Sequence, residues 1–196
     1  RSEFRKKTYK EYKANRSHPG KGADAERDNV FTQIAIVKTL LEHLNVAQLQ
    51  WPGTEADDLI GLACDTLDGL KIVASSDMDM LQLVRPDVQV WSPIKTELYT
   101  ERNFVKRIGL NPRQYLEMRA LVGDGSDNIT GVAKGFGETT AKELIWKYGS
   151  LEKLFTPKVE KHVVRKGNRY ALLYSEGAKD IAYRNLILMD LGVCGQ

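Results

Sequence analysis

The sequence has little cysteine and little histidine. Among its 196 residues there are two cysteines, Cys64 and Cys194, and three histidines. Two cysteines so far apart match neither a zinc-ligand spacing nor a disulfide framework, which is typical of a protein from a reducing compartment. We therefore expect a cytoplasmic protein, with Cys64 packed on the inner face of a helix rather than used in catalysis.

Long apolar runs are missing as well. No stretch approaches the roughly 18 consecutive apolar residues that suggest a membrane span, and the first residues lack the apolar core of a signal peptide. The mean hydropathy is −0.39 and 28% of the residues are charged, which predicts a water-soluble protein without membrane association. A hydrophobic share of 42% still allows a core, so the length corresponds to one domain, or to one domain with a small appendage.

A strong net charge is missing too, but the charge of +3 is unevenly spread. Residues 1–22 carry eight basic side chains against two acids, and residues 158–169 carry five against one acid. The acids concentrate between these segments. An acidic centre with basic flanks is typical of an enzyme whose substrate is a polyanion. Two solvated basic faces would give the same pattern, and charge alone leaves both interpretations open.

Helical and strand patterns alternate along the first half, which predicts an α/β core followed by an all-helical part from about residue 101. The expected helices cover residues 25–44, 54–67, 112–122 and 139–148, and the expected strands cover residues 46–50, 71–74, 88–91 and 97–100. Residues 2–16 are expected as a helix, or as a strand that leads into one, and residues 17–24 as a loop. We place the core in residues 1–100 and the helical subdomain in residues 101–196.

Seven carboxylates form three tight clusters in the middle of the chain. They are Glu55, Asp57 and Asp58, then Asp77 and Asp79, then Asp124 and Asp127. Brought together, these groups would repel one another unless positive charge lay among them, and two divalent cations are the simplest source. A ligand set made only of oxygen atoms is typical of Mg²⁺ or Mn²⁺. The clusters therefore predict a metal-dependent phosphodiesterase that acts on nucleic acid.

Each cluster also has a structural explanation. Thr54 and Asp57 match a helix-capping pattern, and acids in a first turn interact favourably with the helix dipole. The second cluster fits a turn or a helix cap, and the third fits an Asx-turn in a glycine-rich loop. Each explanation is reasonable for its own cluster. The presence of all three clusters in one chain nevertheless favours the metal site.

A glycine-rich connection over residues 123–137 follows the third cluster. Within residues 134–140, Gly135 and Gly137 would let backbone amides approach a phosphate, and the next helix would present its positive N-terminus. Contacts made by the backbone do not read bases. This segment therefore predicts binding to nucleic acid that is largely independent of base sequence.

Together these motifs resemble the 5′ nuclease superfamily, which includes flap endonucleases, the 5′→3′ exonuclease domain of bacterial DNA polymerase I and free-standing phage 5′ nucleases. The matching segments are 55–58, 76–79 and 123–128 for the acids, and 131–141 for a helix–hairpin–helix. The resemblance implies a central, mostly parallel sheet flanked by helices (a PIN-like α/β core) with a C-terminal helix–hairpin–helix subdomain. It implies a structure-specific 5′→3′ exonuclease and flap endonuclease of DNA replication or repair. The residues around Arg184 also look like the free-standing forms.

The resemblance also assigns roles to residues. It implies two Mg²⁺ or Mn²⁺ ions, the tighter one held by Glu55, Asp57, Asp58 and Asp77 or Asp79, the other by Asp124, Asp127 and Asp79. It places Lys13 and Arg16 at the scissile phosphate, where they would neutralise developing charge, and lets Tyr12 stack on a base. The implied DNA-binding residues of the helix–hairpin–helix, where K⁺ is often held, are Lys134, Gly135, Gly137, Thr139, Thr140 and Lys142. The residues alone favour another interpretation of segment 12–16, a solvated basic helix in which Tyr12 is an ordinary packing residue.

The sequence departs from the superfamily at its start. The superfamily begins with a strand that ends in a metal-supporting Asp, and a second Asp follows before the segment that corresponds to residues 12–16; neither is present here. We therefore expect a piece of a longer, monomeric protein that acts on DNA with 5′ flaps, nicks or 5′ ends, and that is inactive without the rest. Two alternatives stay open: a non-catalytic, structure-selective DNA-binding module, and a PIN-type nuclease that cuts RNA, although the latter usually lacks a helix–hairpin–helix.

Overall fold

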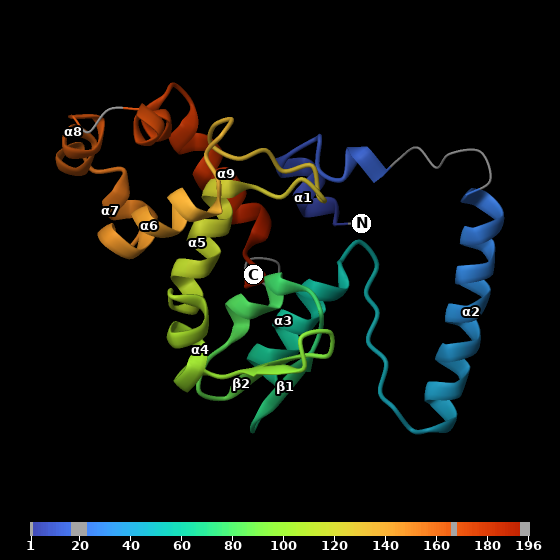
Figure 1. Cartoon of the computed structure of the whole chain (residues 1–196). Helices are drawn as coiled ribbons and strands as arrows, with labels where there is room; N and C mark the ends of the chain where they lie inside the picture. Colours follow the sequence, from blue (N-terminus) through green and yellow to red (C-terminus); the bar gives the residue numbers. More distant parts are fainter. Residues whose placement is uncertain (1, 17–22, 166–167, 193–196) are drawn as a thin grey trace.

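The computed structural model describes residues 2–16, 23–165 and 168–192 (Figure 1). The chain begins with the short helix α1 (Glu3–Thr8), the 3₁₀ turn η1 (Ala14–Arg16) and the long helix α2 (Ala23–His43). Ser2 caps α1 because its Oγ accepts a hydrogen bond from the backbone N–H of Arg5 at 3.2 Å. The helix predicted over residues 25–44 is confirmed, whereas most of the loop predicted over residues 17–24 lies outside the described residues.

The strand predicted over residues 46–50 is wrong. This segment runs back alongside α2 without strand pairing and is held by side chains: Gln48 donates to the carbonyl of Lys38 at 2.9 Å, and Lys38 donates to Gln50 at 2.7 Å. In Figure 1, α2 and this segment stand apart from the rest of the molecule. A strand needs a neighbouring strand for its backbone groups, and in the described residues none lies beside this segment.

A three-stranded sheet follows. After α3 (Ala56–Thr66) come β1 (Lys71–Ala74), the 3₁₀ helix η2 (Met78–Leu83), β2 (Val88–Ser92) and β3 (Glu97–Tyr99). The order is β1-β2-β3, with β1 parallel to β2 in the register Lys71 to Val88, and β2 antiparallel to β3 in the register Val90 to Tyr99. The predicted sheet is confirmed, but one of its two pairings is antiparallel. In the described part of the chain, β2 is the only strand that pairs with β1.

The second half is helical, as predicted. Its elements are α4 (Glu101–Ile108), α5 (Pro112–Val122), α6 (Glu138–Tyr148), α7 (Leu151–Leu154), α8 (Pro157–Arg165), η3 (Asn168–Tyr174) and α9 (Ala178–Met189). Asn111 caps α5, with its Oδ1 2.9 Å from the backbone N of Gln114, and Pro112 occupies the first helical position. In the part of the chain that the structure describes, no helix has the length and apolar character that crossing a membrane requires.

Both halves share one hydrophobic core around α5. Met80 of η2, Phe104 of α4, Leu121 of α5 and Ile145 of α6 belong to it and are fully buried. Cys64 is also buried there, on the inner face of α3 as predicted. Because α5 packs against η2, α6 and α9, its end and the loop that follows it are held close to the end of β1 and the start of α3. The acidic clusters lie at this junction.

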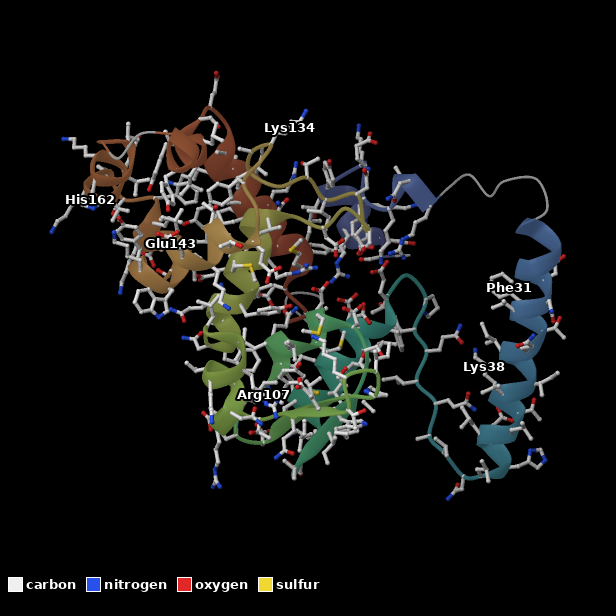
Figure 2. All side chains as sticks on the ribbon, in the orientation of Figure 1. Phe31, Lys38, Arg107, Lys134, Glu143 and His162 are labelled. Atoms are coloured by element: carbon white, nitrogen blue, oxygen red, sulfur yellow. The ribbon has the colours of Figure 1, made fainter. Side chains whose placement is uncertain are left out.

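A small apolar surface remains open at the end of α3 and along β1. We call Leu67, Leu70 and Ile72 the β1 edge; all three are about 60% exposed, at 60%, 61% and 59%. Beside them lies an apolar hollow whose lining includes Ile60, Cys64, Leu67 and Ile72. Apolar side chains of α2, among them Phe31 (labelled in Figure 2), are exposed as well.

Candidate metal and nucleic-acid site

Five of the seven predicted acids line one small cavity. They are Glu55, Asp57, Asp79, Asp124 and Asp127. We call this space the acid cavity. Arg5 and Tyr12 from the beginning of the chain complete its polar lining. Residues far apart in the sequence, on α3, η2 and the loop after α5, therefore meet at one place.

The first cluster opens α3. The backbone N–H of Glu55 donates to Asp58 Oδ2 at 3.3 Å, so the capping pair lies one residue beyond the predicted pair Thr54 and Asp57. Glu55 Oε2 accepts hydrogen bonds from the Tyr12 hydroxyl at 2.8 Å and from Lys13 Nζ at 2.7 Å. Burial raises the pKa of Glu55, but the hydrogen bonds from Lys13 and Tyr12 outweigh it, so the net pKa is lowered. Glu55 is therefore ionised and bound to its neighbours.

Asp58 is held by Arg5, a residue that the sequence had not singled out. The two terminal nitrogens of Arg5 donate to the two oxygens of Asp58, each at 2.6 Å, and Arg5 Nε donates to the carbonyl of Leu188 at 2.7 Å. The side chains are 3% and 2% exposed. Arg5 thus ties α1 to α3 and α9. Both carboxylate oxygens of Asp58 are engaged here, and its role as a metal ligand stays a prediction.

Lys13 and Arg16, the two residues predicted to bind the scissile phosphate, both form ion pairs with Asp127. Arg16 Nη2 is 2.5 Å from Asp127 Oδ1, Lys13 Nζ is 3.5 Å from Asp127 Oδ2, and the backbone N–H of Lys13 donates to the Asp127 carbonyl at 2.8 Å. Asn128 Nδ2 in turn donates to the carbonyl of Glu11 at 2.7 Å. Segment 9–16 is therefore docked on the loop that carries the third acidic cluster, with the Arg16 side chain half exposed.

Tyr12 is a packing residue in this arrangement. It is 3% exposed and packs in a small cluster with Leu116, Ile129 and Leu188. Its hydroxyl lies 2.8 Å from Glu55 Oε2 and 3.2 Å from Asp127 Oδ2. Burial and the neighbouring carboxylates raise the pKa of Tyr12 far above its usual range, so the hydroxyl keeps its proton. Stacking on a base stays a prediction, and it would require the ring to leave this cluster.

Arg119 of α5 joins the second and third clusters. Its Nη2 is 3.0 Å from Asp79 Oδ1 and 2.9 Å from Asp124 Oδ2. Its Nε is buried and has no hydrogen-bond partner among the described residues. The sequence did offer a signal, because an arginine in the largely apolar end of a helix, five residues before Asp124, needs a buried partner.

Two acids in this region, Asp79 and Asp57, have raised pKa values. Burial raises the pKa of Asp79 to about 6, and repulsion from Asp77 and Asp124 adds to this effect, against the opposing charge of Arg119. Burial, together with repulsion from Asp77, also raises the pKa of Asp57. Protonation at these positions is favoured mainly because burial disfavours the charged carboxylate, and repulsion from neighbouring acids adds to it.

Local hydrogen bonds hold the second and third clusters in place. Asp77 accepts from the backbone N–H of Asp79 at 2.8 Å, which makes it the cap of η2. Asp124 Oδ1 accepts hydrogen bonds from the backbone N–H and the hydroxyl of Ser126, both at 2.7 Å. This is the Asx-turn that the sequence offered as the structural explanation of the third cluster. The loop passes very close to the end of α5. A Cβ on Gly131 would lie 2.2 Å from the carbonyl oxygen of Val122, so the close approach requires glycine. A side chain at residue 131 would therefore displace the loop.

The metal prediction has a mixed outcome in this geometry. The basic side chains of Arg5, Lys13, Arg16 and Arg119 lie among the acids, so repulsion alone does not require a metal. In residues 2–16, 23–165 and 168–192, no three acids, histidines or cysteines surround a point where an ion could bind. The donor set is nevertheless all oxygen, and burial raises the pKa of Asp57 and Asp79, so a bound cation would favour their ionised forms. The donors fit a hard divalent cation.

The predicted helix–hairpin–helix is formed by α5 and α6, which pack together across residues 123–137. Gly137 precedes the first residue of α6, and Lys134, Gly135 and Thr139 are exposed. Figure 2 shows Lys134 on the outer side of this connection. Thr140, by contrast, is 5% exposed and packs inward. The contacts of these residues with DNA stay predictions.

Sequence models of one family cover almost the whole chain. The model of the 5′-3′ exonuclease N-terminal resolvase-like domain matches residues 1–109, and the model of the 5′-3′ exonuclease C-terminal SAM fold matches residues 110–190. The chain belongs to the 5′-3′ exonuclease family. The predicted resemblance is therefore confirmed, and so is the α/β fold class with a helical C-terminal part.

This member of the 5′-3′ exonuclease family has many curated relatives. It is 43% identical over 161 residues to DNA polymerase I of Mycobacterium tuberculosis, a match of 79% of this chain and 17% of the polymerase. It is 36% identical over 160 residues to a 5′-3′ exonuclease of Mycoplasma pneumoniae, a match of 78% of this chain and 52% of that protein. The chain thus spans about half the length of its exonuclease relatives and less of the polymerases.

Solved structures share the fold of this exonuclease-family chain. One is the T5 D15 protein co-crystallised with metal ions, with a TM-score of 0.79 at 23% identity over 98% of this chain and 71% of that one. Another is the T5 5′-exonuclease with bound zinc, with a TM-score of 0.80 at 23% identity over the same shares. At this identity the likeness establishes the arrangement of the elements and leaves the roles of individual residues to experiment.

Proposed function

We propose that the protein to which this chain belongs is a structure-specific 5′ nuclease that hydrolyses DNA phosphodiesters near 5′ ends, nicks and flaps. The observation that carries the proposal is the acid cavity, in which the three predicted acidic clusters meet Lys13 and Arg16. Family membership supports the same activity. Since the chain covers about half of its exonuclease relatives, the activity is proposed for the longer protein.

Divalent metal, proposed as Mg²⁺ or Mn²⁺, would be held by carboxylates of the acid cavity. Asp57 and Asp79 are the first candidates because they line the acid cavity and burial disfavours their ionised forms, which a cation would stabilise; Asp77, Asp124 and Asp127 are adjacent candidates. Bound metal in such sites lowers the pKa of a water molecule and stabilises the leaving oxygen. One structural neighbour, the T5 D15 flap endonuclease, was crystallised in a complex with DNA and metal ions, which supports this assignment.

The chain's own residues would bind and orient the DNA. Lys13 and Arg16 already sit at the carboxylate of Asp127, and a scissile phosphate could replace that carboxylate as their partner. The exposed backbone around Gly135 and Gly137 would hold a duplex by its phosphates, with K⁺ as a proposed additional ligand. We further propose that the protein works as a monomer in the cytoplasm of a bacterium or of a phage-infected host.

A non-catalytic DNA-binding module is the second candidate. It is favoured by the ion pairs of the acid cavity, because Lys13, Arg16 and Arg119 satisfy acids that would otherwise bind metal. Such a module would keep its grip on duplex DNA and lack turnover at any metal concentration.

A cleavage assay separates the candidates. The substrates are 5′-flap DNA, single-stranded DNA and RNA with Mg²⁺, and the two enzymes are this chain and a chimera in which it replaces the matching 160 residues of the Mycoplasma pneumoniae relative. We expect the chimera to cut flap DNA. In the chimera, Asp124→Asn with Asp127→Asn should abolish cleavage and preserve binding of flap DNA.

The matched control is Asp68→Asn in the same chimera, because Asp68 is exposed and lies outside the acid cavity. This control should cleave normally. Unchanged turnover of the double variant would overturn the site assignment. A chimera that binds flap DNA without cutting it would favour the module, and faster cutting of RNA than of DNA would favour a PIN-type nuclease.

A further inference from the structure

A second polar cavity adjoins the acid cavity on the other side of Arg119. Its volume is about 400 Å³, and it lies between the turn after β2 and helices α4, α5 and α6. Four basic side chains line it, Lys95, Arg107, Arg119 and Lys142, against one acid, Glu138. We call it the basic cavity. Arg107 is labelled in Figure 2.

Within the described residues, the two lysines of the basic cavity have no carboxylate partner. Arg107 is paired with Glu97 at 2.8 Å, but among the contacts of the described residues neither Lys95 nor Lys142 forms an ion pair through its ammonium group. Lys142 lies against the end of α4, where a Cβ on Gly109 would be 3.1 Å from Nζ. The carbonyl end of α4 accounts for this position, yet it supplies only a partial charge. The ammonium groups of both lysines are therefore not neutralised by a carboxylate of the described residues, and a negatively charged ligand could pair with them.

Arg119 adds a further positive charge to the lining of the basic cavity. Its Nη2 is used by Asp79 and Asp124, whereas its Nε is buried without a partner among the described residues. A buried donor of this kind costs about 1 to 3 kcal/mol when it stays unpaired. Because this burial keeps Nε out of reach of the open space of the basic cavity, Arg119 contributes its positive charge to that cavity.

We propose that the basic cavity binds a phosphate group of a nucleotide unit, as a second phosphate subsite next to the acid cavity. The volume suits one nucleotide, because small-molecule sites typically measure about 300 to 1,000 Å³. Leu110 and Met118 supply an apolar wall for the sugar or base. The ligand has two possible sources, a strand of bound DNA and a released nucleoside monophosphate. The assignment rests on the proposed function.

Binding measured on the full chain without divalent metal tests the proposal, and its result does not depend on cleavage. The probes are a 5′-phosphorylated DNA hairpin, thymidine 5′-monophosphate, thymidine and inorganic phosphate, each titrated by calorimetry or anisotropy. We expect Lys95→Ala with Lys142→Ala to weaken binding of the phosphate-bearing ligand about tenfold. The same pair should lower the slope of log affinity against log salt for the hairpin by about two. Thymidine should not bind.

The matched control pair is Lys106→Ala with Lys153→Ala, two exposed lysines outside the basic cavity. A loss confined to the hairpin assigns the subsite to a DNA strand, and a loss that includes the monophosphate assigns it to the product as well. Equal losses for the two pairs, or no loss in either, would overturn the proposal. The milder pair Lys95→Gln with Lys142→Gln, checked for native unfolding, keeps the test valid if the alanine pair folds poorly.

Discussion

Arg119 Nη2 lies 3.0 Å from Asp79 Oδ1, so a cation of the chain itself stands where carboxylates of two clusters meet. The same nitrogen is 2.9 Å from Asp124 Oδ2. A divalent ion that binds both acids must compete with this guanidinium for their oxygens. We therefore predict that Arg119 weakens the binding of a divalent metal ion in the acid cavity.

Removing Arg119 should therefore tighten metal binding. In Arg119→Gln the carboxylates of Asp79 and Asp124 lose their competitor and gain mutual repulsion, so we expect Mn²⁺ affinity to rise about tenfold, a change of about 1.4 kcal/mol. Calorimetric titration with Mn²⁺ measures it. Arg85→Gln is the control, because Arg85 pairs with Asp65 and Asp87 away from the acid cavity. Weaker or unchanged Mn²⁺ binding in Arg119→Gln would show that the guanidinium does not compete with metal.

Asp79 should make stability depend on pH. Burial raises its pKa from an ordinary 3.8 to about 6, so the folded state holds this proton more tightly than the unfolded state. The contribution of Asp79 to stability is therefore most favourable below about pH 4 and declines until the pH passes about 6. Two pKa units correspond to nearly 3 kcal/mol, and partial exposure reduces the expected effect to about 1 to 2 kcal/mol. Asp79→Asn should thus stabilise the fold at pH 7.5 more than at pH 5.

Urea unfolding at the two pH values measures this difference. Asp87→Asn serves as a control of opposite sign, because a hydrogen bond from Lys71 holds the pKa of Asp87 below its usual range. Asp87 is ionised at both pH values, and its substitution should destabilise the protein equally at each. If Asp79→Asn were equally destabilising at pH 5 and at pH 7.5, the raised pKa of Asp79 would have no part in stability.

Arg5 and Asp58 should behave as one unit. Both side chains are almost fully buried and share two hydrogen bonds of 2.6 Å. Removal of Arg5 takes both strong donors from the buried Asp58 carboxylate, which costs about 3 to 5 kcal/mol. Arg5 without Asp58 keeps Glu55 at 3.8 Å and the carbonyl of Leu188 at 2.7 Å, so the loss of Asp58 should be the smaller one. We expect Arg5→Met to destabilise strongly and Asp58→Asn less, and the double variant to be much less unstable than the sum of the two. Chemical unfolding of the four proteins gives the coupling energy, and additive losses would contradict a pairwise bond.

Local patterns predicted most of the elements, and long-range contacts account for what they missed. The helix over residues 112–122 begins and ends as predicted, because Asn111 and Pro112 start it and Gly123 ends it. Residues 46–50 have strand-like composition but lack a strand partner. Acidic spacing predicted five residues that line the acid cavity, and their role in catalysis stays a prediction. The nearby counter-ions Arg5 and Arg119 were missed. Arg5 meets Asp58 across 53 residues of sequence, and no local pattern identifies such a partner.

The open β1 edge should cause the isolated chain to self-associate. Leu67, Leu70 and Ile72 are each about 60% exposed, and β1 pairs on one side only within the described residues. An apolar edge strand is a template for pairing with another chain.

We expect Leu67→Glu with Ile72→Lys to shift the sedimentation of this chain toward the monomer without lowering its melting temperature, since neither side chain is buried. Val105→Lys on α4, at a residue of similar exposure, should leave sedimentation unchanged. In the Mycoplasma chimera the same pair should instead destabilise the fold if the added sequence covers the edge. Identical sedimentation of wild type and the β1-edge variant at equal concentration would exclude this surface as the site of association.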